Sequence, residues 1–424
     1  MTDTPGLRRA MGGFDATTVG IGSMIGAGVF VVFAPAAAAA GSWLPLAVVV
    51  AGFIAYCNAA ATAKLATVYP SSGGTYIYGR RQLGPWAGFL AGWSFITGKL
   101  ASCAAMALTF GLYAAPGFET AAAIAAVVAL TSVNLLGVTR TALLTRAIVS
   151  LVVPVIAFVV VVAFASPAPD EPWVAAANGP VGVLQAAALL FFAFAGYARI
   201  ATMGEEVRNP RRNIPAAILG ALGFTLLLYL LLAFALLSAL GPDTLAGSPA
   251  PLRDVFDTVA DPGRPPTGDG GAIPRAAVTV AAALASLGAL LALIAGVGRT
   301  TLAMAREGDL PQALSRISTR FGVPWAADVL SAVVVVVLLL TTDVLTVVGF
   351  SSFGVLLYYA IANAAAFTLP ERQWYAPRFL NVVGAGGCLV LAFTLPPVSV
   401  LSMLAVLVAG VLCRMVVLKV RGRP

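Results

Sequence analysis

The stretch Gly20–Gly28 reads Gly-Ile-Gly-Ser-Met-Ile-Gly-Ala-Gly and lies in a long apolar segment near the start of the chain. Each glycine costs a helix interior about 1 kcal/mol relative to alanine, so this stretch predicts an interrupted helix. In a bilayer, non-helical backbone is tolerated only where it is buried in protein or lines a cavity. Two interpretations follow: an unwound binding segment, or a glycine face on which neighbouring helices pack closely.

The surrounding composition places this stretch in a membrane. Of the 424 residues, 60% are hydrophobic and 10% are charged, whereas soluble domains carry about 25% charged residues. A helix needs about 20 apolar residues to cross the hydrocarbon core, and twelve such stretches predict an all-α polytopic membrane protein. Numbered as spans 1–12, they are 17–39, 43–68, 85–114, 121–138, 146–166, 182–204, 214–240, 273–298, 326–342, 344–369, 379–395 and 398–418.

Residue usage argues against an enzyme. The chain has no His, which excludes imidazole catalysis and His-ligated metal. Its cysteines, Cys57, Cys103, Cys388 and Cys413, lie singly in apolar stretches without the spacing of a metal site. The spans also contain neither HExxH nor a pair of Asp residues. The sequence therefore predicts no catalytic residue, no metal and no cofactor.

The basic residues indicate the topology. With a cytoplasmic N-terminus, eighteen Lys or Arg residues fall in cytoplasmic segments, and only Arg253, Arg264 and Arg275 fall outside. This asymmetry follows the positive-inside rule, so the net charge of +8 is not interpreted as nucleic-acid binding. We expect a bacterial inner-membrane protein with both termini in the cytoplasm. The polar loop at about 241–272 is expected outside the membrane, with little regular structure.

Span 6 carries a second interruption. It reads Phe191-Phe192-Ala193-Phe194-Ala195-Gly196-Tyr197-Ala198-Arg199, five spans after the first. Interrupted helices at corresponding positions of two halves mark a transporter site at the membrane midplane. Their half-helix ends suit the carboxylate and the ammonium of an amino acid. The predicted substrate-binding residues are Ile21, Gly22, Ser23, Met24, Ile25, Gly26, Ala27, Gly28, Phe192, Ala193, Phe194, Ala195, Gly196 and Tyr197.

Four segments give the chain a family resemblance. They are Gly22–Phe30, Tyr69–Tyr76 with the following Gly84 to Trp93, Gly196–Pro215 and Ala303–Pro311. In this order and spacing they resemble the amino acid–polyamine–organocation (APC) superfamily, of the amino acid permease type. The resemblance implies a five-plus-five inverted repeat in spans 1–10 and alternating access. It divides the chain into an N-terminal tail (1–13), a transport core (14–369), peripheral spans 11–12 (370–418) and a C-terminal tail (419–424).

Lys99 lies near the centre of span 3, about 21 Å of helix from Pro85 at 1.5 Å per residue. Intramembrane charges usually face a cavity or a partner. The hypothesis is that Lys99 carries a coupling proton or replaces a bound cation; the alternative is a Lys fixed by backbone carbonyls. Span 5 lacks the Lys of several proton-coupled relatives, so Na⁺ coupling also stays open. Ser286 on span 8 is a candidate for a cation site, or packs between helices.

Charged residues also lie near the cytoplasmic end of span 6. Arg199, Glu205 and Glu206 are candidates for a cytoplasmic gate. In the alternative interpretation, the stretch is a solvated loop in which Pro210 ends span 6 and Asn213 caps span 7.

The substrate class is predicted from what spans 1, 3, 6 and 8 lack. Without a mid-depth carboxylate they favour amino acids with neutral side chains, because a cationic side chain or a polyamine would need one. The alternatives are an amine or polyamine carrier and an exchanger without ion coupling. A channel is disfavoured because the spans lack a polar stripe. The expected partners are a small amino acid, H⁺ or Na⁺, and the lipid bilayer.

Overall fold

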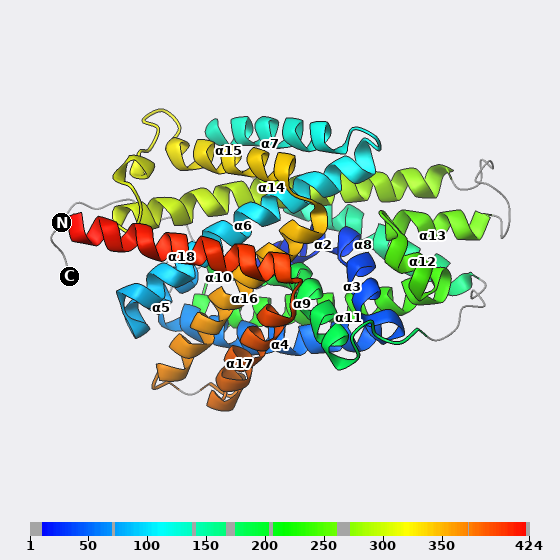
Figure 1. Cartoon of the computed structure of the whole chain (residues 1–424), viewed down its shortest axis with the longest axis horizontal. Helices are drawn as coiled ribbons and strands as arrows, with labels where there is room; N and C mark the ends of the chain where they lie inside the picture. Colours follow the sequence, from blue (N-terminus) through cyan, green and yellow to red (C-terminus); the bar gives the residue numbers. More distant parts are fainter. Residues whose placement is uncertain are drawn as a thin grey trace.

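The computed structural model describes residues 11–69, 73–137, 141–166, 174–202, 207–260, 272–371 and 373–420. Within these ranges the chain is almost entirely helical (Figure 1). The helices are α1 Gly13–Met24, α2 Gly28–Val31, α3 Phe33–Ala40, η1 Gly41–Trp43, α4 Leu44–Val68, α5 Gly74–Leu83, α6 Pro85–Ala114, α7 Glu119–Leu135, α8 Thr141–Ala165, α9 Pro180–Phe194, η2 Ala195–Tyr197, α10 Ala198–Thr202, α11 Pro210–Leu240, α12 Pro242–Gly247, α13 Pro251–Ala260, α14 Ala272–Arg306, η4 Gln312–Ser315, α15 Trp325–Thr341, α16 Val344–Thr368, α17 Arg378–Thr394 and α18 Pro397–Val420.

These helices confirm an all-α polytopic membrane protein. In the described part of the chain, nine helical segments are long and apolar enough to cross a bilayer, and α7, α15 and α17 are shorter apolar helices. Each of the twelve predicted stretches overlaps one of these segments. The bounds of α6 are those predicted, whereas α14 ends at Arg306 and not at residue 298. An apolar stretch predicts only the part of a helix that lies in the membrane. α14 continues beyond that part, so its end was predicted too early.

Short connections join two pairs of consecutive helices. Between α3 and α4 the turn begins at Gly41, whose φ of 55° is a left-handed conformation that suits glycine. The turn is held in place by the Ser42 amide, which donates to the Val174 carbonyl at 3.0 Å. Between α15 and α16, Asp343 caps α16 because its carboxylate accepts from the Thr346 amide at 2.6 Å.

Two predictions about the loops are wrong, and one loop helix was not predicted. The segment predicted to have little regular structure contains α12 and α13, and α13 packs against α8, α11 and α14. The loop before span 3 contains α5, whose Tyr76 and Tyr78 are buried. Asn213 does not cap span 7, because Pro210 begins α11 and Asn209 is its N-cap. Proline is well suited to the first turn of a helix, where an unpaired amide would otherwise remain.

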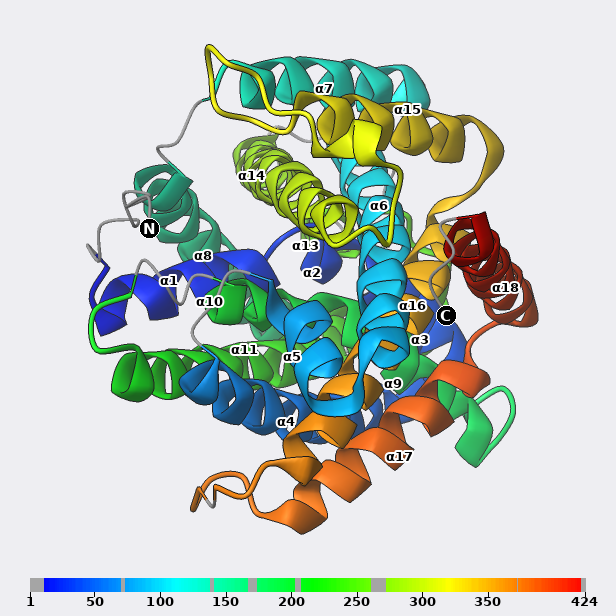
Figure 2. The same cartoon turned by 90° about the vertical axis from the view of Figure 1, so that its left-hand side faces the viewer.

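Close packing of small residues builds the centre of the bundle. Figure 2 shows α6 and α16 in the middle, with α7 and α15 on one outer side and α17 on the opposite side. A Cβ on Gly98 of α6 would lie 3.2 Å from the Ser351 carbonyl oxygen, and one on Gly354 of α16 would lie 2.8 Å from that of Ser94. In lipid, helices associate through such close backbone approaches. These close contacts with α16 therefore fix the position of α6, the helix on which Lys99 lies.

Candidate functional site at the crossing of two broken helices

Span 1 is interrupted within the stretch that the sequence marks. α1 ends at Met24, Ile25–Ala27 are not helical, and α2 begins at Gly28. The last turn of α1 closes with the Ile25 amide donating to the Ile21 carbonyl at 2.8 Å. The buried Tyr229 hydroxyl of α11 donates to the freed Met24 carbonyl at 2.7 Å. The tyrosine thus supplies the partner that the helix no longer provides.

Span 6 is interrupted less completely. After α9 ends at Phe194, the chain narrows into the 3₁₀ turn η2 and continues as α10. The Tyr359 hydroxyl donates to the Ala195 carbonyl at 3.4 Å. The second interruption is therefore a tightened turn and not an unwound segment.

The two interruptions touch each other through backbone. A Cβ on Gly196 would overlap the Ser23 carbonyl and lie 2.5 Å from the Met24 nitrogen. A Cβ on Gly28 would lie 2.8 Å from the Ala193 Cα. The glycine stretch is therefore both unwound and closely packed: the helix is interrupted, and the glycines let a second helix cross it at backbone distance.

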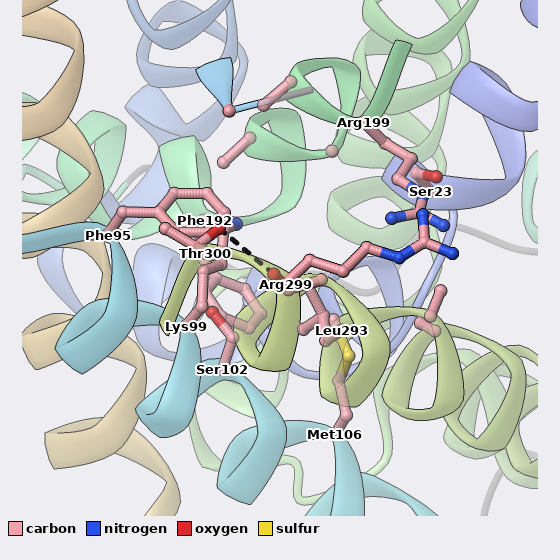
Figure 3. A pocket seen from close by; sticks show the side chains of 17 residues that line it. Ser23, Phe95, Lys99, Ser102, Met106, Phe192, Arg199, Leu293, Arg299 and Thr300 are labelled. Atoms are coloured by element: carbon pink, nitrogen blue, oxygen red, sulfur yellow. Dashed lines mark hydrogen bonds between the residues drawn. The ribbon is translucent and has the colours of Figure 1, made fainter. Parts of the chain in front are cut away.

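A cavity of about 100 Å³ lies beside this crossing. Ser23 and Gly196 line it from the broken helices, Lys99 and Ser102 from α6, and Thr300 from α14. Figure 3 shows Lys99 and Ser102 on α6, with Arg299 and Thr300 on α14. One ordered water needs about 10–15 Å³ on this measure, so the cavity has room for about seven to ten heavy atoms.

Positive charge dominates the cavity. Lys99, Arg199 and Arg299 line it, and among the described lining residues none carries a carboxylate. Only 7% of Lys99 is exposed, whereas the Arg299 side chain is exposed. Lys99 therefore lies at the closed end of the cavity, and Arg299 at its open edge.

Comparison with known proteins identifies the family. A family model described as amino acid permease matches residues 11–418. The chain belongs to the amino acid permease family. It is 53% identical over 412 residues to an uncharacterised transporter of Mycobacterium tuberculosis, a match that covers 96% of this chain and 90% of that protein.

Two named relatives from Bacillus subtilis are more distant. A methylthioribose transporter is 27% identical over 442 residues, covering 96% of this chain and 92% of the relative. A branched-chain amino acid permease is 26% identical over 427 residues, covering 95% and 86%. This chain is accordingly a membrane transporter for an amino acid-like substrate and not an enzyme.

The permease brings some of the predicted site residues together at its cavities. Ser23, Lys99, Phe192, Ala195, Gly196 and Arg199 line the larger one. A second cavity of about 30 Å³ lies between α1, α8 and α14, lined by Gly22, Ser23 and Ala289 among others. α14 therefore forms the wall that opposes the span 1 break.

Other predicted residues lie away from these two cavities. Met24 to Gly28 are buried, and Gly26 packs against Ala289 of α14. Ser286 is fully buried and lines neither cavity. Ile21, Ala193, Phe194 and Tyr197 are likewise absent from both linings. Glu205 and Glu206 lie outside the described residues, so the predicted gate has only Arg199 in the structure.

Sequence reasoning missed several residues that line the larger cavity. Arg299 falls one residue beyond the predicted end of span 8 and was given no role from the sequence. Phe95, Ser102 and Met106 share one side of α6 with Lys99 at helical spacing. Once Lys99 is assigned to a cavity, that spacing is the signal from which they follow.

A cluster outside the cavity joins two of the resemblance segments. Asp309, in the fourth segment, accepts from the Tyr76 hydroxyl at 2.9 Å, and Tyr76 lies in the second segment. Asp309 also pairs with Arg80 at 3.1 Å and with Arg414 of α18 at 3.0 Å. This Asp309 cluster fixes α5, α18 and the end of α14 to one another.

We expect Tyr229→Phe to destabilise the permease and to slow transport. The change leaves the buried Met24 carbonyl without its 2.7 Å donor, which costs about 1–3 kcal/mol. Thermal unfolding of the purified protein and initial uptake rates measure both effects. Tyr56→Phe is the control, because its hydroxyl makes a 3.4 Å bond to the Tyr375 carbonyl away from the break. If Tyr229→Phe and Tyr56→Phe had the same unfolding temperature and the same uptake rate, the Tyr229 hydroxyl would not be needed to stabilise the break.

Proposed function

We propose that this permease is a secondary active transporter that carries α-amino acids by alternating access, with the 100 Å³ cavity as its substrate site. The observation that carries the proposal is the crossing of the two interrupted helices at Ser23 and Gly196, which both line the cavity. Transporter sites lie at such discontinuous helices. The volume suits a small amino acid.

The ends of α1 support an amino acid as the substrate. Ser23 lies in the last turn of α1, where the helix dipole is negative and favours an ammonium group. The cationic lining favours a carboxylate. A polyamine is disfavoured, because the described lining has positive groups and lacks carboxylates. The Bacillus subtilis relatives carry branched-chain amino acids and methylthioribose, so a sugar thioether is the second candidate.

The proposal includes a fold of twelve spans with a five-plus-five inverted repeat and spans 11–12 outside the repeats. The pairing of α1–α3 with α9–α10 as interrupted helices supports it. The excess of Lys and Arg supports cytoplasmic termini and a bacterial inner membrane. A reporter fused to the C-terminus should be active only in the cytoplasm; activity only outside the cell would refute this orientation.

Counterflow tests the function directly. Purified protein in liposomes preloaded with one unlabelled amino acid should accumulate the same labelled amino acid transiently, with saturation at high concentration. A panel of amino acids, methylthioribose and a polyamine identifies the substrate class. Accumulation of methylthioribose or the polyamine, and of none of the amino acids, would refute the proposal. Repeating uptake under a H⁺ gradient, a Na⁺ gradient and neither distinguishes a coupled carrier from an exchanger.

We further propose that Lys99 takes part in proton coupling. Wild-type uptake should then depend on pH, and Lys99→Met should abolish that dependence, because the side chain can no longer gain or lose a proton. Lys64→Met is the matched control: Lys64 is also buried, but its ammonium donates to the Ala366 carbonyl at 3.0 Å. Wild-type uptake that does not vary with pH would exclude this role for Lys99.

A further inference from the structure

We propose that the cavity takes an acidic α-amino acid, one whose side chain carries a second carboxylate, and so has net charge −1. This inference rests on the proposed function and narrows its substrate class. It replaces the preference for neutral side chains, which followed only from the lack of carboxylates in the spans.

The buried ammonium group of Lys99 is the first feature that favours an anionic substrate. It is 93% buried at the closed end of the cavity, since its exposed fraction is 7%. Among the described residues, neither an acidic side chain within ion-pair distance nor a hydrogen-bond acceptor is recorded for its ammonium group. An isolated ammonium in a low-dielectric site costs several kcal/mol. A bound anion would remove that cost, which makes the cavity selective for negative charge.

The guanidinium group of Arg299 is the second feature that favours an anionic substrate. It extends a positive guanidinium at the open edge of the same cavity. The buried Asp328 of α15 offsets part of this charge: its Oδ2 accepts from the neutral Asn134 amide at 2.9 Å, and its Oδ1 has no hydrogen-bond partner among the described residues. With Lys99, Arg299 and Asp328 counted together, the cavity keeps an excess of about one positive charge, which a substrate of net charge −1 would balance. Arg199 is a third positive group in the lining, and because it has interactions of its own we leave it out of the charge balance.

A single carboxylate cannot balance the positive charges of Lys99 and Arg299 when the same substrate also carries an α-ammonium. A neutral amino acid brings one negative and one positive charge, so the cavity would keep its excess. An acidic amino acid brings two carboxylates: one can pair with Lys99 and the other can lie toward Arg299. Its ammonium then faces the end of α1 at Ser23. Glutamate has ten heavy atoms, which fits the available volume.

This role of Lys99 is compatible with coupling. A carboxylate beside an amine favours the charged ammonium, so a bound acidic substrate and the proton on Lys99 would favour each other reciprocally. Acidic amino acid and proton would then be carried together.

Binding to the purified full-length protein in detergent tests the inference. The probes are L-glutamate, the isosteric neutral L-glutamine, L-leucine and succinate, measured by calorimetry and by competition. We expect L-glutamate to bind at least about tenfold more tightly than L-glutamine, since hydrogen bonds to charged groups exceed neutral ones. Lys99→Gln and Arg299→Gln should each weaken L-glutamate binding and leave L-glutamine binding almost unchanged. Arg320→Gln, at an exposed position outside the cavity lining, is the control.

The outcomes separate this inference from the proposed function. If L-glutamine or L-leucine binds as well as L-glutamate, the inference is overturned and amino acid transport stands. Succinate binding equal to that of L-glutamate would overturn the inference, because succinate lacks the ammonium that an α-amino acid would place at the end of α1. Failure of all four probes to bind would overturn the inference. The wild-type ratio of L-glutamate to L-glutamine decides the question even if a variant does not fold.

Discussion

Gly196→Ala should abolish transport. The added methyl group would overlap the Ser23 carbonyl and lie 2.5 Å from the Met24 nitrogen. Those atoms are backbone, so the methyl cannot be accommodated by a change of rotamer. Overpacking a core with extra methylene groups costs about 1–3 kcal/mol, and a backbone clash at the crossing should cost at least as much. Initial uptake into proteoliposomes should fall below about a tenth of wild type, with a lower unfolding temperature.

Gly223→Ala is the matched control. Gly223 lies inside α11, and a Cβ there would meet nothing within 4 Å. Because alanine is the better helix former by about 1 kcal/mol, this variant should be as stable as wild type or more so, with normal uptake. If Gly196→Ala transported as well as Gly223→Ala, the contact between the two breaks would not be required for transport.

Asp309→Asn should lower the stability of the folded protein more than any of the other variants. Asp309 and Arg414 each expose only 5% of their side chains and lie 3.0 Å apart. Removing one partner of a buried ion pair costs about 3–5 kcal/mol, because the other charge stays buried without compensation. Arg414 would retain the Pro85 carbonyl at 2.9 Å and the rings of Trp86 and Phe89. The unfolding temperature of the purified protein measures the loss.

Two further variants separate the buried pair from ordinary surface charge. Combining Asp309→Asn with Arg414→Met should restore part of the lost stability, since no uncompensated cation then remains. Glu307→Gln removes a carboxylate that is 49% exposed and pairs with Arg80 at 3.3 Å, so it should cost at most about 1 kcal/mol. A double variant no more stable than Asp309→Asn would show that Arg414 is not the source of the penalty.

The amino-acid sequence alone was enough to locate the membrane spans and the first break. Long apolar runs have one stable form in lipid, because a helix satisfies its own backbone hydrogen bonds. Glycine spacing in Gly20–Gly28 was sufficient to place the interruption, since the cost of glycine in a helix is local. α5 and α13 were missed for the complementary reason. Their helices are short and depend on the bundle that they pack against.

Which side chains share the cavity, and which freed carbonyls find a donor, depends on the packing of the helices. Tyr229 reaches Met24 from a helix about two hundred residues later in the chain, at 2.7 Å. Arg414 reaches Asp309 from the last helix, and Arg299 joins Lys99 across the interface of α14 and α6. Each contact depends on how helices cross and rotate, which distant small residues set together. Periodicity along one segment carries no information about that rotation, so the positive charge of the cavity became visible only in the assembled bundle.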